Sequence, residues 1–140
     1  MMKSRIKLVE NMQFIGTADS GHGVVMDAPP SSGGNNSGSK PSELLLMAFG
    51  GCSGMDVISI LRKKKQDVTN FEMNVNGEAP DTHPRSFTDI HIEYVVTGRN
   101  ISEDAVQRAI ELSLGKYCMV GTTIGKGAKI THSFKVIQEG

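Results

Sequence analysis

The stretch that decides the fold runs from Lys40 to Lys64 and reads KPSELLLMAFGGCSGMDVISILRKK. Pro41 suits the first turn of a helix, and Ser39 and Ser42 are candidates for its cap. From Leu44 to Leu61 the apolar side chains occupy almost every angle of a helical wheel. A helix that is apolar all round must be covered on all sides. We therefore expect a sheet of the same chain on one side and a second copy of the chain on the rest, in a homodimer.

The residues before this helix read as short strands. Apolar and polar residues alternate over 6–8 and 12–14, so the sequence predicts a hairpin with Glu10-Asn11 as its turn and a further strand over 23–27. Residues 29–39 (PPSSGGNNSGS) carry no large apolar side chain, and we expect a mobile surface loop there.

The residues after the helix read as strands, a second helix and a last strand. Alternation over 71–75 and 90–96 predicts two strands, and apolar residues share one face over 129–137. Ser102 is placed to cap the second helix, which we expect to end near Tyr117–Cys118. Because the strands come in runs, the sequence predicts a single α+β domain over 1–140 with a mainly antiparallel sheet.

Composition limits the partners. Lys plus Arg and Asp plus Glu each total 15, and this zero net charge argues against a nucleic-acid partner and an anionic membrane surface. No uninterrupted apolar run reaches about 18 residues, so we expect no membrane span. The first residues lack the apolar segment of a signal peptide, which makes a cytoplasmic location the expectation.

The two cysteines, Cys52 and Cys118, are the candidates for chemistry. Neither belongs to a CxxC or lies near a histidine at ligand spacing, so we expect no metal site and no cofactor. Gly50, Gly51 and Gly54 surround Cys52, and a helical glycine costs about 1 kcal/mol relative to alanine. Close approach of another backbone would account for them, as would access of a small substrate to the sulfur. A buried, inert Cys52 is equally open on these residues alone.

The expected position of each cysteine separates their roles. Cys118 would lie at the negative end of a helix dipole, which disfavours a thiolate. If one cysteine attacks, Cys52 is the better candidate and Cys118 is its resolving partner. Asp56 lies one helical turn after Cys52 and faces the same way, so its charge would raise the thiol pKa unless a cation intervenes.

Three stretches of the sequence resemble the OsmC/Ohr family of hydroperoxide-resistance proteins. They are the stretch quoted above, HPRSFTDIHIEYVVTG (83–98) and KYCMVGTTIGKGAKITHSFKV (116–136). The resemblance implies an OsmC-like fold: an intertwined homodimer with mainly antiparallel sheets on two long central helices. It also implies active sites at the dimer interface, each built on a cysteine pair, with Cys52 as the attacking and Cys118 as the resolving residue.

The mechanism that the resemblance implies is reduction of an organic hydroperoxide. Cys52 becomes a sulfenic acid, Cys118 condenses with it to a disulfide, and an external dithiol, a lipoylated protein in related members, reduces that disulfide. Typical members also use an arginine near the N-terminal strands, where this chain has only His22, and a glutamate ten positions before the first cysteine. Here Glu43 is nine positions before Cys52 and would reach the sulfur only across a bend in the helix.

Two other functions fit the same residues. A non-enzymatic redox sensor would form the Cys52–Cys118 disulfide without turnover. A small-ligand-binding protein or scaffold would use the apolar dimer cleft and leave both thiols unmodified.

Overall fold

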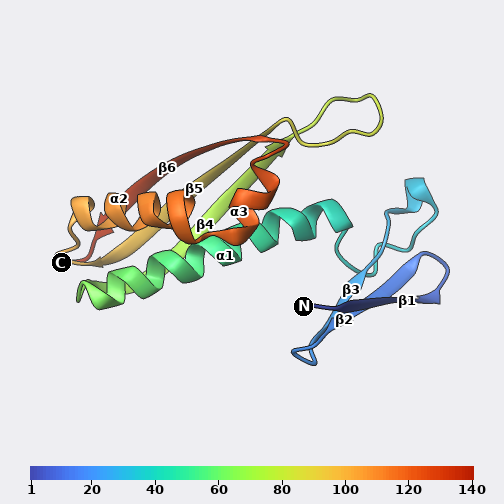
Figure 1. Ribbon diagram of the computed structural model, residues 1–140, viewed down its shortest axis with the longest axis horizontal. Helices are drawn as coiled ribbons and strands as arrows, with labels where there is room; N and C mark the ends of the chain where they lie inside the picture. Colours follow the sequence, from blue (N-terminus) through green and yellow to red (C-terminus); the bar gives the residue numbers. More distant parts are fainter. The chain divides into compact units, whose positions relative to one another are not determined.

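The structure is a computed structural model that describes residues 1–140. Its ribbon is drawn in Figure 1. The chain divides into two compact units, Met1–Leu45 and Leu46–Gly140. The long helix α1, Pro41–Lys63, begins in the first unit and continues in the second. A single domain over 1–140 stays a prediction, and each unit is described by itself.

The N-terminal unit is a three-stranded antiparallel sheet in the order β1-β2-β3. The strands are β1 (Ser4–Glu10), β2 (Gln13–Ala18) and β3 (Gly23–Met26). The β1–β2 turn lies one residue later than expected, at positions 11 and 12, because Glu10 still pairs with Gln13. Asn11 adopts the left-handed conformation there, with φ of 47°, which asparagine tolerates better than most residues.

The loop after β3 is organised by one buried carboxylate. Asp27, 4% exposed, accepts hydrogen bonds from the backbone N–H groups of Ala28, Asn35 and Ser37 and from the Ser37 hydroxyl. These bonds, with the Ser37 hydroxyl first, lower the pKa of Asp27 to about 2. A short 3-10 turn, η1 (Pro30–Ser32), lies inside the loop. The carboxylate that organises this loop lies just outside the polar stretch, and the mobility expected of the loop stays a prediction.

The C-terminal unit contains the second sheet, in the order β4-β5-β6. Strands β4 (Asp67–Glu78) and β5 (Asp89–Arg99) are antiparallel, whereas β5 and β6 (Lys129–Gln138) are parallel. The other strand pairings of the chain are antiparallel. The predicted α+β class, with mainly antiparallel sheets, is therefore confirmed.

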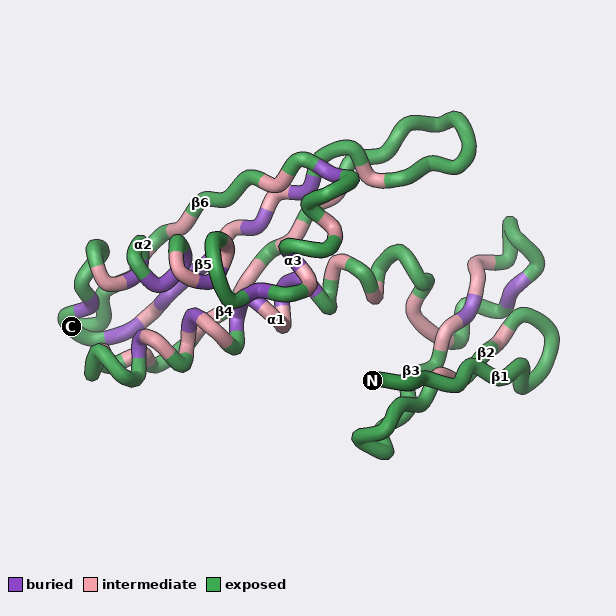
Figure 2. Tube along the Cα trace, viewed as in Figure 1, coloured by how far each residue is buried: buried purple, intermediate pink, exposed green.

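Helices α1 and α2 (Glu103–Leu112) pack on one face of this sheet and bury one core with it (Figures 1 and 2). Ser102 caps α2 as predicted, because its hydroxyl accepts the Ala105 N–H at 3.2 Å. The largest fully buried side chains of the core come from α1, β5 and α2: Phe49, Val57, Leu61, Ile90, Ile92, Tyr94, Val96, Val106 and Ile110.

The second helical stretch ends where expected. Helix α2 stops at Leu112, a π-helical turn η2 (Ser113–Tyr117) continues directly from it, and the backbone of Cys118 is extended. The third helix, α3 (Met119–Ile124), was not expected, and Gly121 inside it packs against Phe49. Cys118 therefore lies between two helical segments.

Helix α1 is 23 residues long with a hydropathy of 1.8, so it is long and apolar enough to span a membrane by those two measures. Small and weakly polar residues interrupt its apolar run without making the helix polar. The expectation of no membrane span stays a prediction. Phe49, Val57 and Leu61 are nevertheless fully buried against the sheet and α2, as in the core helix of a folded domain. The chain itself supplies one long helix, so a centre of two long helices stays part of the dimer prediction.

Candidate functional site

The structure brings the two cysteines together. Cys52 lies in the middle of α1, and Cys118 lies between η2 and α3. Both are free thiols. Their sulfur atoms and a carboxylate oxygen of Asp56 all lie within 4.8 Å of one another. The fold thus brings Cys118 into one cluster with Cys52 and Asp56, although it lies far from them in the sequence.

Cys118 is the enclosed member of the pair. It is 1% exposed, and its sulfur accepts the Gly121 N–H at 3.2 Å. Burial raises the pKa of the Cys118 thiol to about 11, against the opposing effect of the Gly121 hydrogen bond and with smaller contributions from Cys52 and Asp56. Cys118 lies at the end of η2 and also begins α3, so it faces the ends of two helical dipoles. Desolvation is the main cause of its raised pKa.

Cys52 is half-buried, so it is the more accessible residue of the pair. Packing against β4 explains two of the three glycines around Cys52. A Cβ on Gly50 would lie 3.2 Å from Val75 Cγ2, and a Cβ on Gly54 would collide with the end of Met73, so both glycines let α1 approach β4. A Cβ on Gly51 would meet nothing within 4 Å.

A chain of buried hydroxyls leads to Asp56. Ser53 Oγ lies 2.6 Å from Tyr94 Oη and 2.8 Å from Ser113 Oγ, and Ser113 Oγ donates to Asp56 Oδ2 at 2.9 Å. An ionised carboxylate only accepts, so Ser113 must use its proton on Asp56 and accept from Ser53. Ser53 in turn accepts from Tyr94, and each hydroxyl donates toward the carboxylate. A tyrosine is protonated at neutral pH, and burial raises the pKa of Tyr94 further, to about 12.

The three residues of this hydroxyl chain, Ser53, Tyr94 and Ser113, were not among the predicted site residues. Each one occupies a buried position of its element: α1 for Ser53, β5 for Tyr94 and the start of η2 for Ser113. The sequence did contain a signal for these residues, because each places a polar atom on a face that is otherwise apolar. Because buried hydroxyls need partners, three of them on three inward faces indicate a shared network.

Glu43, the third predicted site residue, lies in the N-terminal unit and is exposed. Its carboxylate accepts the Lys40 N–H at 2.8 Å and so caps the start of α1, a function expected of Ser39 or Ser42. His22 is also exposed, and its Nδ1 lies 3.3 Å from Ser20 Oγ. A catalytic role for Glu43 stays a prediction.

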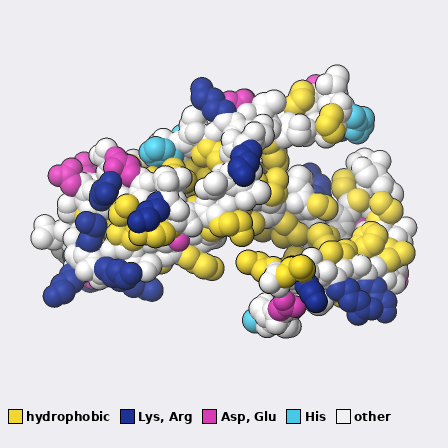
Figure 3. Space-filling view, viewed as in Figure 1, with side chains coloured by type: hydrophobic (Ala, Val, Ile, Leu, Met, Phe, Trp, Pro, Cys, Tyr) yellow, Lys and Arg dark blue, Asp and Glu magenta, His cyan; other side chains and the backbone are white.

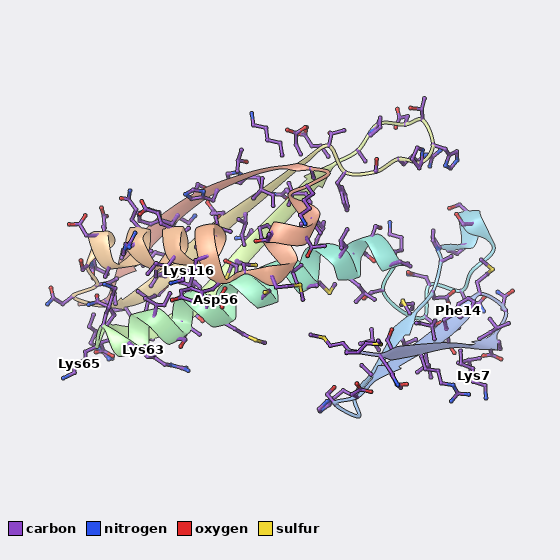
Figure 4. The ribbon with its side chains drawn as sticks, in the orientation of Figure 1. Lys7, Phe14, Asp56, Lys63, Lys65 and Lys116 are labelled. Carbon is purple, nitrogen blue, oxygen red and sulfur yellow. The ribbon has the colours of Figure 1, made fainter.

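A groove in the C-terminal unit reaches Asp56. Its volume is about 520 Å³, and its lining is mixed: Met55, Asp56, Ser59, Ile60, Lys63, Lys64, Leu112 and Tyr117. Figure 4 labels Asp56 on α1 next to the turn that carries Lys116, and Figure 3 shows several basic side chains around the end of α1 and others elsewhere on the surface. Two sulfurs and a carboxylate are also a donor set that a thiophilic cation such as Zn²⁺ accepts. The expectation of no metal site stays untested.

Comparison with known proteins relates this geometry to a family. A family model described as OsmC-like protein matches residues 34–133. Protein YhfA of Escherichia coli K12 is 44% identical over 139 residues, which cover 97% of this chain and 98% of YhfA. A hypothetical protein from Aquifex aeolicus VF5 is 29% identical, with a TM-score of 0.87 over 100% of this chain and 98% of its own. An organic hydroperoxide resistance protein OsmC from Legionella pneumophila shares the fold, with a TM-score of 0.69 at 12% identity over 97% of each chain.

Proposed function

Because the chain belongs to the OsmC-like protein family, we propose that it reduces organic hydroperoxides through a Cys52–Cys118 thiol pair. The family includes proteins described as organic hydroperoxide resistance proteins, which supports a role in peroxide or stress resistance. The observation that carries the proposal is the proximity of the two sulfurs, within 4.8 Å in the reduced chain. Sulfur atoms this close need only a small movement to form a disulfide.

Exposure and acidity assign the two cysteines different roles. Cys52 is half-buried, so a small peroxide can reach its sulfur. Cys118 is buried and its pKa is raised to about 11, so it is a poor first nucleophile. Cys52 is therefore the attacking residue and Cys118 the resolving residue.

The chemistry balances with one peroxide and two thiols. The Cys52 sulfur attacks a peroxide oxygen, the O–O bond breaks, and Cys52 sulfenic acid and an alcohol form. The Cys118 thiol then displaces water from the sulfenic acid to give the disulfide. An external dithiol reduces this disulfide by exchange and is itself oxidised. A lipoylated protein has the required dithiol chemistry. A cytoplasmic location, where thiols are kept reduced, belongs to the same proposal.

A homodimer completes the proposal. The N-terminal unit buries no apolar side chain, and its strands expose Ile6, Leu8, Phe14 and Val24. Figure 3 shows exposed apolar side chains gathered over parts of the molecule. Met47 and Met55 on α1 are 57% and 74% exposed. A three-stranded sheet needs a packed face for stability, and a second copy of the chain offers matching apolar surfaces. A sedimentation mass of one chain at micromolar concentration would contradict the dimer.

The activity is tested with cumene hydroperoxide and a dithiol reductant in a coupled assay. Wild type should turn over repeatedly, Cys52→Ser should not react, and Cys118→Ser should stop after forming a sulfenic acid. Equal, slow peroxide consumption by wild type and Cys52→Ser would refute the enzyme. Disulfide formation without turnover would favour the redox-sensing function instead.

A further inference from the structure

Asp56 is a charged group beside the two thiols that has no cation to balance it. Its carboxylate lies within 4.8 Å of both sulfurs and forms neither of the chain's two ion pairs, which join Arg99 to Asp67 and Arg108 to Glu111. Lys63 and Lys64 line the groove that reaches Asp56, but neither forms an ion pair with the Asp56 carboxylate. A negative charge in this position opposes ionisation of a neighbouring thiol. Asp56 therefore does not activate Cys52 electrostatically, and the presence of this carboxylate beside the thiols needs another explanation.

The hydroxyl chain holds Asp56 in one place. Ser113 donates to Oδ2, and Ser53 and Tyr94 extend the same line of donors into the core. Every donor points toward the carboxylate, which stabilises its charge without neutralising it. The other oxygen, Oδ1, has no hydrogen-bond donor and remains able to accept a proton.

We propose that Asp56 is the proton carrier of the cysteine pair, taking the thiol proton of Cys52 and delivering it to the leaving oxygen of the peroxide. This inference rests on the proposed function. Ser113, Ser53 and Tyr94 are positioning residues, because they contact Asp56 or one another and not the reacting atoms. A carboxylate within 4.8 Å of the sulfur can exchange a proton with it through one water, which meets the geometric requirement for general acid–base catalysis.

The step conserves atoms and charge. As the Cys52 sulfur bonds to the peroxide oxygen, its S–H proton passes to the Asp56 carboxylate and the O–O electron pair leaves with the alkoxide. The protonated carboxyl group then gives that proton to the alkoxide, so the products are Cys52 sulfenic acid, an alcohol and the regenerated carboxylate. The cluster holds one negative charge throughout, which avoids a second charge in a half-buried site.

The test compares two reactions of the Cys52 thiol that differ in their need for a proton. In a single turnover with cumene hydroperoxide the leaving alkoxide must be protonated, whereas iodoacetamide releases iodide, which needs no proton. Asp56→Asn should slow sulfenic acid formation by about 100-fold. Iodoacetamide reacts with the thiolate that forms by proton exchange with solvent before the reaction. The same variant should therefore react with iodoacetamide at least as fast as wild type, because removal of the negative charge favours the thiolate. Asp81→Asn, an exposed loop carboxylate of the same unit, is the matched control and should change neither rate.

The outcomes separate the inference from the proposed function. Ser113→Ala should slow the peroxide reaction less than Asp56→Asn and leave alkylation unchanged, because it only loosens the carboxylate. An Asp56→Asn variant that reacts with peroxide as fast as wild type, or loses both reactions equally, would contradict the role of Asp56 as proton carrier. The proposed peroxidase activity would be unaffected by either result. A wild-type protein that is alkylated but not oxidised would overturn the enzyme and with it the carrier.

Discussion

The Cys118 sulfur accepts the Gly121 N–H at 3.2 Å, so the first turn of α3 encloses the thiol that must later resolve the sulfenic acid. The space around it is tight, because a Cβ on Gly121 would lie 3.2 Å from this sulfur and 2.9 Å from Phe49 Cε1. This enclosure explains both the small exposure of Cys118 and its weak acidity. It also makes the reactivity of the two cysteines unequal, which can be measured.

The first prediction concerns the pH dependence of alkylation. Because the pKa of Cys118 is raised to about 11, its thiolate fraction should still be rising about tenfold per pH unit at pH 9. Iodoacetamide at pH 8 should therefore label Cys52 well before Cys118, as read by mass spectrometry of the two peptides. Faster labelling of Cys118 at pH 8 would contradict its assignment as the resolving residue.

The same shift has a consequence for stability. A thiol whose pKa is higher in the folded than in the unfolded chain stabilises the fold below the unfolded pKa, near 9, and loses that contribution as pH rises through about 11. The difference in unfolding free energy between wild type and Cys118→Ala should therefore shrink from pH 8 to pH 11. Urea denaturation at the two pH values measures it, and a constant difference would argue against burial as the cause.

The second prediction concerns the hydroxyl chain. Ser53→Ala leaves Tyr94 Oη without its acceptor and Ser113 Oγ without its donor, in a buried site. An unsatisfied buried polar group costs about 1–3 kcal/mol, so the variant should lose about that much unfolding free energy. Ser59→Ala, on the exposed side of the same helix, is the control and should lose less than about 0.5 kcal/mol. Equal losses of unfolding free energy in the two variants would mean that the chain of hydroxyls contributes nothing to the stability of the fold.

The third prediction concerns the loop over 28–38. Its hydrogen bonds to the Asp27 carboxylate hold the pKa of Asp27 near 2, so Asp27→Asn should open the loop at neutral pH and raise its amide exchange. A carboxylate with a lowered pKa stabilises above its unfolded pKa and stops doing so as pH falls through the folded value. The difference in exchange between variant and wild type should therefore be present at pH 7 and decrease toward pH 2. The same difference at both pH values would show that the charge is not the organising feature.

Sequence patterns predicted most of the fold because its elements have clear periodicity. The α1 helix, the strands around Phe71 and Ile92 and the Ser102 cap all lie where local residues place them. Helix α3 and the parallel pairing of β6 were not predictable, because both depend on packing against distant residues. Proximity of the cysteines followed from the family resemblance, since no local pattern connects α1 to a turn 66 residues later.

The hydroxyl chain and the helix cap by Glu43 show more clearly what could not be predicted from the sequence. Ser53 and Ser113 lie 60 positions apart, and their contact depends on how α1 and η2 pack on β5. Glu43 has the residue type of a catalytic carboxylate, yet its observed partner is the Lys40 N–H. Residue type and spacing therefore indicated candidates, whereas hydrogen-bond partners needed the three-dimensional arrangement.

One equivalent of cumene hydroperoxide added to the fully reduced protein, followed by non-reducing peptide mass spectrometry, tests the central claim most directly. We predict a single linked pair, Cys52 to Cys118, with loss of two thiols per peroxide, and in Cys118→Ser a sulfenic acid confined to Cys52. Two free thiols after complete mixing with peroxide, or oxidation that begins at Cys118, would contradict the account.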